Sequence, residues 1–247
     1  MRRTALALLL SSLVVPGLAA TPAAADITIF SPGISNGPLR ILAAEWTQKT
    51  GQKVVITGGN VGRIRTAVAK DTPADIVLAP TSDFQDFAPK LAGAPVPLGR
   101  IQFGMVVKAG GRHPDISTEQ KFIAVTKEVG TLAYANPAVG SLSGGLVEKM
   151  LQRPEFSGVK PLPIRGMIGD AIVRGDAEFG GGAISEELMA KDAEVVGPFP
   201  DSLGVFIDMS GAVLKTSAAP DDARAFLVWL VRPDSGTVWQ KGGIVSP

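Results

Sequence analysis

Short apolar runs and amphipathic stretches alternate along the chain in the pattern typical of strands connected by helices. Runs at residues 27–30, 53–57 and 75–79 are apolar or rich in β-branched side chains, which predicts three strands, the first of them buried. Between them, apolar side chains recur at helical spacing at Leu39, Leu42, Ala43 and Trp46, and again at Ile64, Ala67 and Val68. The order strand, helix, strand, helix, strand predicts a parallel sheet with right-handed crossovers.

A second series of strands and helices follows a stretch rich in proline and glycine at residues 92–98. An apolar strand is predicted at 101–108. The further elements predicted in this series are strands at 132–135, 161–164 and 177–183 and helices at 142–151 and 168–174. A second break at residues 197–200 precedes a last strand at 205–214 and a helix at 221–231.

These two series predict an α/β protein with two lobes. Residues 26–100 and 201–247 would form lobe 1, and residues 101–200 would be inserted into it as lobe 2. Each lobe would have a mostly parallel sheet flanked by helices. The chain would cross between the lobes twice, and two such crossings make a hinge.

The first 25 residues have the features of a signal peptide. Arg2 and Arg3 give a positive start, residues 5–15 are apolar, and residues 23–25 are alanines, which predicts cleavage after Ala25. The paired arginines leave the twin-arginine route open. An ordinary secretory signal is favoured, because the polar motif around such a pair is absent. No cysteine is present for lipid attachment, so we expect free export to the periplasm.

The composition excludes several classes of function. The formal net charge is +1, so neither nucleic acid nor an anionic membrane surface is expected as a partner. No segment after the signal approaches the roughly 18 apolar residues that a membrane span needs. With one histidine and no cysteine, a zinc or iron site is not expected, and no cofactor is predicted. A serine–histidine relay would have to use His113, which lies in the turn-like segment 110–114 (GGRHP).

Three loops carry the candidate ligand-binding residues. In open parallel sheets, ligands bind beyond the carboxyl ends of the strands, and backbone N–H groups at a helix N-terminus favour an anion there. One loop contains Ser31 and Ser35, the second is residues 58–63 (GGNVGR), and the third is residues 141–145 (SLSGG) in lobe 2. The predicted ligand-binding residues are Ser31, Ser35, Asn60, Gly62, Arg63, Ser141, Ser143 and Gly144.

Each of these loops also has a purely structural interpretation. Arg63 and Arg65 could point into solvent from an ordinary strand-to-helix turn, and the serines could cap helices. Capping is the favoured role of Ser82 and Asp83, which follow the third strand.

Other charged residues lie close to the expected loops. Arg165 could reach the cleft from lobe 2, although this is the less favoured interpretation. Asp208 lies on the returning strand, where a structural contact at the hinge is favoured. Glu186 and Glu187 begin a helix, where acidic side chains interact favourably with the helix dipole. A catalytic pair is not predicted there.

Several segments resemble the periplasmic solute-binding proteins of the molybdate-binding type. The most specific is residues 72–76 (TPADI), which is similar to a Gly-Ala-Pro-Ala-Asp marker of that family. The others are residues 27–30, 50–54, 175–180 with 185–186, 223–230 and 242–247. The resemblance covers nearly all of the chain after the signal. It implies the type 2 periplasmic binding fold, in which two α/β lobes close on a small anion for delivery to an inner-membrane ABC permease.

The ligand positions implied by the resemblance carry different residues here. Ile34 stands where a serine is implied after the first strand, and residues 60–61 are Asn and Val where a serine pair is implied. A tyrosine is implied near positions 182–183, which are Gly and Ala, and the only tyrosine is Tyr134. Arg63 at the mouth is a further difference. Its guanidinium group favours a carboxylate or phosphorylated ligand.

We therefore expect a soluble, monomeric periplasmic protein that captures a small anion, either an oxyanion or an organic carboxylate, between its lobes. Contacts from both lobes would stabilise the closed form for an ABC permease. Some relatives of the family are isomerases of unsaturated tricarboxylic acids, so an aconitate-type isomerase is the alternative. Its base would be a carboxylate, a lysine or Tyr134. A sensor subunit that presents the ligand to a receptor is a third possibility.

Overall fold

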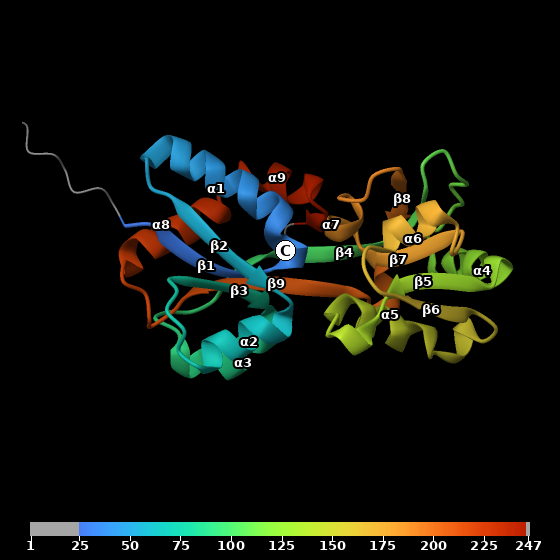
Figure 1. The fold of residues 1–247 in the computed structure, drawn as a ribbon, viewed down its shortest axis with the longest axis horizontal. Helices are drawn as coiled ribbons and strands as arrows, with labels where there is room; N and C mark the ends of the chain where they lie inside the picture. Colours follow the sequence, from blue (N-terminus) through green and yellow to red (C-terminus); the bar gives the residue numbers. More distant parts are fainter. Residues whose placement is uncertain (1–24, 246–247) are drawn as a thin grey trace, which may run out of the picture.

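Three parallel strands form the base of lobe 1 in the computed structural model, which describes residues 25–245 (Figure 1). They are β1 (Ile27–Pro32), β2 (Val54–Gly59) and β3 (Ile76–Pro80), in the order β2-β1-β3. The helices of this lobe are α1 (Asn36–Thr50), α2 (Val61–Ala69), α3 (Phe84–Phe87), α8 (Pro220–Leu230) and α9 (Ser235–Lys241). The predicted parallel arrangement of the first three strands is confirmed.

Two antiparallel strands, β4 (Val96–Lys108) and β9 (Phe206–Val213), connect the lobes (Figure 1). Residues 96–102 of β4 pair with β9 beside β3, and residues 103–108 pair with the strands of lobe 2. One crossing therefore lies within β4 and the return lies at the start of β9. The finer lobe boundaries at residues 100 and 200 stay a prediction.

Strand β4 begins earlier than the sequence predicts. A break was expected over residues 92–98, but the strand already pairs from Val96 and continues through Pro97 and Gly99. The pairing register shifts between Pro97 and Gly99, which is where a sheet tolerates proline. Gly99 has a φ of 147°, and a Cβ there would lie 2.5 Å from the carbonyl oxygen of Val245 in strand β10 (Ile244–Val245).

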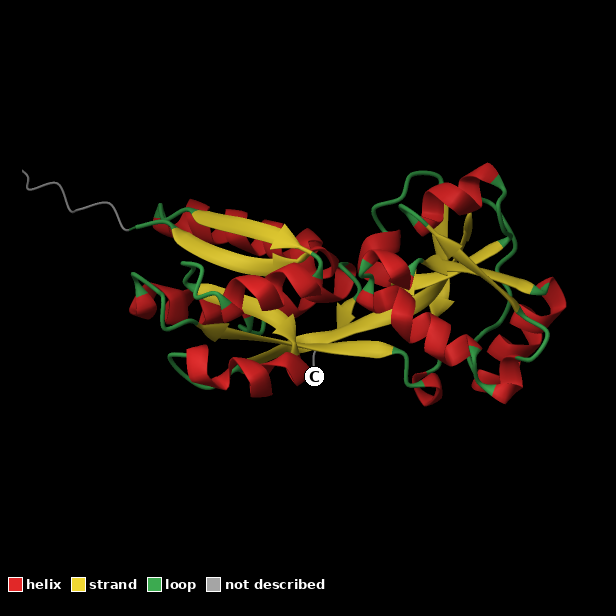
Figure 2. Cartoon of the chain, turned by 60° about the horizontal axis from the view of Figure 1, so that its bottom comes forward, coloured by secondary structure: helices red, strands yellow, loops and turns green. Residues whose placement is uncertain are grey.

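Lobe 2 has a parallel centre with antiparallel strands added to it. Strand β5 pairs in parallel with β6 and β7, and β4 pairs antiparallel with β7 and β8. The strands are β5 (Thr131–Ala135), β6 (Lys160–Ile164), β7 (Phe179–Ala183) and β8 (Ala193–Pro198). The helices are α4 (Glu119–Val129), α5 (Leu142–Leu151), α6 (Ile168–Arg174) and α7 (Ile184–Glu187). Figure 2 shows this second group of strands and the helices around it.

Four elements were missed by the sequence analysis: α4, α9, β8 and β10. Helix α4 carries ordinary end signals, because the hydroxyl of Thr118 accepts from the N–H of Lys121 and Gly130 ends the helix with a φ of 72°. Strand β8 extends into the predicted break at 197–200 and ends at Pro198.

The core is apolar and aromatic in both lobes. Trp46 meets Phe226 and Trp229 edge to face between α1 and α8, and Phe122 meets Phe156 and Phe199 in lobe 2. Among the described residues no helix combines the length and the apolar character of a membrane span. The predicted signal peptide lies, apart from Ala25, outside the described residues.

Candidate functional site

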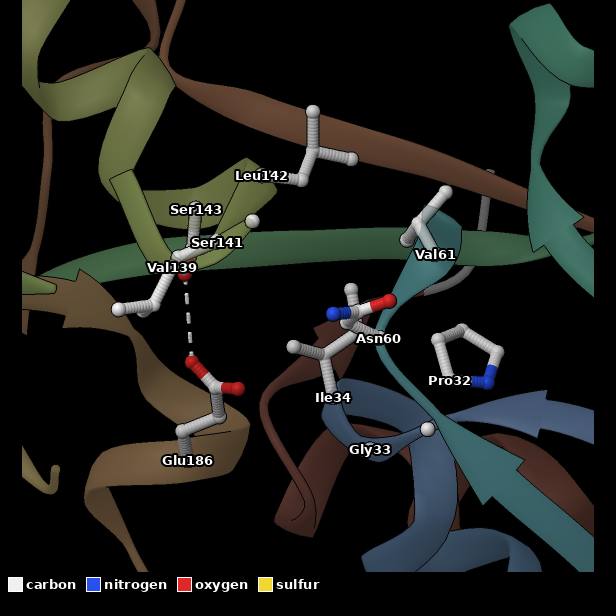
Figure 3. A pocket seen from close by; sticks show the side chains of 12 residues that line it. Pro32, Gly33, Ile34, Asn60, Val61, Val139, Ser141, Leu142, Ser143 and Glu186 are labelled. Atoms are coloured by element: carbon white, nitrogen blue, oxygen red, sulfur yellow. Dashed lines mark hydrogen bonds between the residues drawn. The ribbon is translucent and has the colours of Figure 1, made fainter. Parts of the chain in front are cut away.

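A cavity of about 280 Å³ lies where the loops of the two lobes meet (Figure 3). We call it the interlobe cavity. The lobe 1 residues that line it are Pro32, Gly33, Ile34, Gly59, Asn60 and Val61. The lobe 2 residues that line it are Val139, Gly140, Ser141, Leu142, Ser143 and Glu186. The loops expected to face each other across a gap therefore do so.

On the lobe 1 side, Asn60 is held by its position at the N-terminus of α2. Its side-chain Oδ1 accepts a hydrogen bond from the N–H of Arg63 at 2.9 Å, which fixes the orientation of the amide. The amide nitrogen then points across the cavity toward lobe 2 (Figure 3). A Cβ at Gly140 would lie 3.2 Å from this nitrogen, so glycine at 140 lets the two rims approach.

On the lobe 2 side, a chain of hydroxyl groups leads to a carboxyl group. The N–H of Gly144 donates to Ser141 Oγ at 3.0 Å, which caps α5. The Oγ atoms of Ser141 and Ser143 are 3.0 Å apart, and Ser143 Oγ donates to Glu186 Oε2 at 3.4 Å. Because Ser141 already accepts from a backbone N–H, its own proton is free to point to Ser143. The hydroxyl of Ser143 is then directed at Glu186.

Two adjacent acidic groups lie in this region: Glu186, which is half-buried, and Glu187, which is buried. Burial raises the pKa of Glu186, and the hydrogen bond from Ser143 offsets this only in part. Glu187 is 3% exposed, and its Oε2 is buried without a hydrogen-bond partner among the described residues. Burial, reinforced by the charge of Glu186, raises the pKa of Glu187 to about 8. The pKa of each group is therefore shifted upward, and that of Glu187 is shifted further because Glu186 carries charge beside it.

A smaller cavity of about 170 Å³ adjoins the interlobe cavity behind Glu186. The two cavities share Val139, Ser141 and Glu186, and the smaller one also reaches Glu187. Glu186 thus stands between the two spaces, with its Oε2 on Ser143. Figure 3 shows the other carboxyl oxygen directed toward the side of Ile34 and Asn60.

Comparison with known proteins shows the family to which the chain belongs. A sequence profile of bacterial extracellular solute-binding proteins matches residues 27–245. The chain belongs to this family. Among curated relatives of this solute-binding protein, an aconitate isomerase from a Pseudomonas species is 29% identical over 248 residues. The match covers 96% of this chain and 93% of the relative.

Two solved structures show the fold of this solute-binding protein. The substrate-binding domain of a putative molybdenum ABC transporter from Clostridium difficile has a TM-score of 0.74 at 14% identity, and the match covers 91% of this chain and all of that one. The periplasmic molybdate-binding protein of Azotobacter vinelandii has a TM-score of 0.66 at 17% identity, with 90% and 100% covered. These likenesses confirm the two-lobed periplasmic binding fold that the sequence predicted.

Three of the eight predicted ligand-binding residues line the interlobe cavity, and five do not. Asn60, Ser141 and Ser143 line it. The five that lie outside the lining are Ser31, Ser35, Gly62, Arg63 and Gly144. A role in binding stays a prediction for all eight.

Ser31 and Ser35 lie beneath the cavity wall. They are 0% and 1% exposed, and their Oγ atoms are 2.9 Å apart. Ser35 also donates to the carbonyl of Pro32 at 3.0 Å, and it makes no side-chain bond that caps α1. These hydroxyls hold the turn at Gly33–Ser35, whose Ile34 faces the cavity.

Gly144 and Arg63 lie next to residues of the cavity lining but are not part of it. A Cβ at Gly144 would lie 1.8 Å from the carbonyl oxygen of Ala135, so only glycine lets α5 pack this closely against the end of β5. Arg63 is exposed, and its side chain lies over Gly59, which does line the cavity. The guanidinium group is therefore next to the interlobe cavity without forming its wall.

The structure corrects the capping role expected of Ser82 and Asp83, since neither makes a side-chain capping bond, and it places the other candidates outside the cavity. Asp83 makes no capping bond to α3; it receives two hydrogen bonds from Arg65, at 2.7 and 2.8 Å. Arg165 is exposed and lies outside the interlobe lining. His113 lies in a loop and is 3.0 Å from Glu194. Asp208 pairs with Arg100 between β9 and β4, as a hinge contact should.

Tyr134 is a core residue, which removes it as a base in the cavity. It is 1% exposed, and its hydroxyl donates to Glu148 at 2.9 Å. Burial and the neighbouring carboxylate raise its pKa to about 12. Within residues 25–245, no cluster of acidic or histidine side chains suited to a metal ion is found.

Glu186 lines the interlobe cavity, and the sequence analysis did not predict it there. The pair at 186–187 was interpreted as acidic side chains near a helix dipole, and α7 does begin there. The pair is instead turned inward, with Glu186 in the cavity wall and Glu187 buried. A signal was available, because residues 185–186 had been matched to the family segment that returns from lobe 2.

Proposed function

We propose that this solute-binding protein captures a small organic carboxylate in the interlobe cavity. The observation that carries the proposal is that both lobes contribute to one cavity, with Ile34 and Asn60 on one side and Ser141, Ser143 and Glu186 on the other. A ligand that touches both sides is held best when the lobes are together. Binding would therefore shift the population toward the closed form.

The chemistry of the wall favours an organic carboxylate over an inorganic oxyanion. Four branched aliphatic side chains face the cavity: Ile34, Val61, Val139 and Leu142. An oxyanion presents oxygen on every side and would leave these groups without an apolar partner. A carbon chain that ends in carboxylates can place its apolar part against them and its oxygens on Asn60 and Ser141.

The charge of Glu186 also bears on the ligand. An ionised carboxylate in the wall would repel a bound anion, whereas a protonated one donates a hydrogen bond to it. Burial raises the pKa of Glu186, which lowers the cost of protonating it when an anion enters a cavity whose lining, among the described residues, has no cation. Delivery to an inner-membrane ABC permease from the periplasm, by a monomer, completes the proposal.

A thermal-shift screen tests the proposal. Molybdate, tungstate, sulfate, phosphate, and di- and tricarboxylates are each added, and the melting temperature is measured. A ligand that binds only the native state stabilises it by mass action. We expect tricarboxylates or dicarboxylates to raise the melting temperature by several degrees. A rise with molybdate or sulfate alone would contradict the assignment of a carboxylate.

Substitutions then locate the site. Asn60→Ala removes the amide that faces lobe 2 and should weaken the ligand's affinity by about tenfold, which is ~1.4 kcal/mol. The control Gln240→Ala removes an exposed amide from α9 and should leave affinity unchanged. Equal affinities for both variants would move the ligand out of the interlobe cavity.

Arg63 and Arg65 form a matched pair for testing charge at the mouth. Arg63 lies beside the cavity, whereas Arg65 is paired with Asp83. We expect Arg63→Ala to weaken affinity a few-fold at low salt, and Arg65→Ala to leave it unchanged. A loss for Arg63→Ala as large as that for Asn60→Ala would mean that the guanidinium group contacts the ligand directly.

An isomerase of unsaturated tricarboxylic acids is the second candidate. It is favoured by the aconitate isomerase that is 29% identical over nearly the whole chain, and by a carboxyl group in the cavity wall. Incubation with cis-aconitate or trans-aconitate, followed by ultraviolet absorbance, tests it directly. Interconversion would establish the enzyme; binding without interconversion would leave the capture function alone.

A further inference from the structure

Glu186 is singled out by its place in the interlobe cavity. Among the 12 residues that line the cavity within the described chain, it is the one with an ionisable side chain. The remaining polar side chains there are an amide and two hydroxyls, which bind anions and do not exchange protons with carbon at neutral pH. Any proton transfer inside this cavity must therefore use Glu186 or a water molecule.

The surroundings of Glu186 orient its two oxygens differently. Oε2 accepts from Ser143, whose hydroxyl is aligned through Ser141 by the N–H of Gly144. The other oxygen points into the cavity toward Ile34 and Asn60 (Figure 3). One oxygen is thus held by the protein and the other is left to meet the ligand. This is the arrangement that a positioned acid–base group requires.

We propose that Glu186 is the catalytic residue of this site and moves a proton between two carbons of a bound unsaturated carboxylate. The inference rests on the proposed capture of a carboxylate in the same cavity. The ligand class it specifies is a polycarboxylate with a saturated carbon next to a carbon–carbon double bond.

The step balances without a co-reactant. Ionised Glu186 takes a proton from the saturated carbon, and the electron pair of that C–H bond becomes a new double bond to the adjacent carbon. The electrons of the old double bond shift to its far carbon, which takes a proton from the Glu186 carboxylic acid. One C–H bond breaks and one forms, so the double bond moves by one position and nothing is oxidised or reduced.

The environment of Glu186 suits both halves of this step. A general base must have a pKa near the working pH, and burial moves the pKa of Glu186 upward toward it. Negative charge spreads onto the ligand's conjugated carboxylate while the proton is on Glu186. The Asn60 amide is directed across the cavity to where that charge would lie.

The test follows isomerisation and proton exchange with aconitate as the probe. The wild-type protein is incubated with cis-aconitate or trans-aconitate in D₂O, with absorbance reporting isomerisation and NMR reporting deuterium on carbon. Glu186→Gln should lower both rates by at least 100-fold and keep the ligand-induced rise in melting temperature. The matched control Glu178→Gln changes an exposed carboxylate that pairs with Arg112 and should keep the wild-type rate.

Each outcome decides something. If the wild-type protein binds aconitate but neither isomerises it nor incorporates deuterium, the inference is overturned and capture stands. If no carboxylate raises the melting temperature, capture itself fails and the inference fails with it. A wild-type rate in Glu186→Gln overturns the inference. Should Glu186→Gln not fold, Glu186→Asp replaces it: the shorter side chain should lower the rate at least tenfold, and an unchanged rate overturns the proposal.

Discussion

Two acidic sites, one in each lobe, differ in how many hydrogen bonds their carboxyl groups accept. In lobe 1, Asp75 is 5% exposed and accepts four hydrogen bonds of 2.7–3.1 Å, from the N–H and hydroxyl of Thr28, the hydroxyl of Ser217 and the N–H of Ala218. In lobe 2, Glu186 accepts one bond of 3.4 Å, and Glu187 has a buried oxygen without a described partner.

The direction in which each pKa shifts depends on the hydrogen bonds that the carboxyl group accepts, because all three groups are subject to burial. Burial alone would raise the pKa of Asp75, but the bonds from Thr28, Ser217 and the backbone lower it below its usual value. Burial of Glu186 and Glu187 is not offset in this way, and their pKa values rise. A carboxylate with all its hydrogen bonds stabilises the fold in its ionised form, whereas a carboxyl group with few hydrogen bonds takes up a proton at higher pH.

The largest expected effect comes from breaking the lobe 1 site. Asp75→Asn keeps the shape but leaves one acceptor oxygen and places an NH₂ group against donors. We expect it to lower the free energy of unfolding by about 2–4 kcal/mol, because hydrogen bonds to a charged group are lost in a buried place. Chemical denaturation at pH 7 measures this change.

Asp71→Asn is the matched control for Asp75→Asn. Asp71 is an exposed carboxylate that pairs with Lys90 at the surface, and asparagine tolerates its positive φ of 52°. We expect a change below about 0.5 kcal/mol. Equal effects of the two substitutions would show that the bonds to Asp75 do not distinguish it from a surface carboxylate.

Asp75 also shows what the sequence could predict. It belongs to the segment 72–76, which carried the most specific resemblance to the family, and it ties the start of β3 to Thr28 in β1. Sequence pattern was sufficient for the first three strands. β1 and β3 are short runs buried in the core, and β2, at the edge of the sheet, is a β-branched run whose side chains are half-buried or exposed. Periodicity failed where pairing decides the structure, as in β4, whose early residues are a strand only because β9 lies beside them.

The second prediction concerns the pH dependence of lobe 2. Glu187 binds its proton more tightly in the folded state, so its contribution to stability is complete below pH 4.5, its ordinary pKa, and is lost as the pH rises to about 8. Glu187→Gln stays neutral and should remove this loss. At pH 8 the variant should exceed the wild type in unfolding free energy by roughly 3 kcal/mol, relative to their difference at pH 4.5.

Urea titrations of both proteins between pH 4.5 and 8 measure this difference. Glu186 and Asp170 are the charged neighbours that raise the pKa of Glu187, and the N–H of Gly169 lowers it. Glu178→Gln, at the surface, controls for the loss of one negative charge. Parallel pH curves for wild type and Glu187→Gln would mean that Glu187 is ionised in the folded protein, and the contrast with Asp75 would then disappear.

The residues of the candidate site were only partly predictable, because the site forms only where the two lobes meet. Asn60 and Ser141 could be predicted from the sequence. Asn60 follows strand β2 and Ser141 follows a short loop, and each residue caps the helix that comes next. Glu186 has no such local signal: an acidic pair at a helix start is equally typical of an exposed surface. Its inward direction depends on the packing of α7 against β4 and β7, which sequence spacing does not encode.

The smallest expected effect comes from the one bond that Glu186 accepts. Ser143→Ala removes a hydrogen bond that lowers the pKa of Glu186, so that pKa should rise by less than about one unit. Anion affinity should be highest while Glu186 is protonated and fall as the pH passes its pKa. The midpoint of this fall, measured by titration calorimetry over pH 5–9, should therefore move upward in Ser143→Ala, and Ser143→Thr should restore it. Glu187 titrates nearby, so the same series in a Glu187→Gln background assigns the midpoint to Glu186. An unchanged midpoint would mean that Ser143 only fills space beside the carboxyl group, and that the hydroxyl chain from Gly144 does not reach the proton on Glu186.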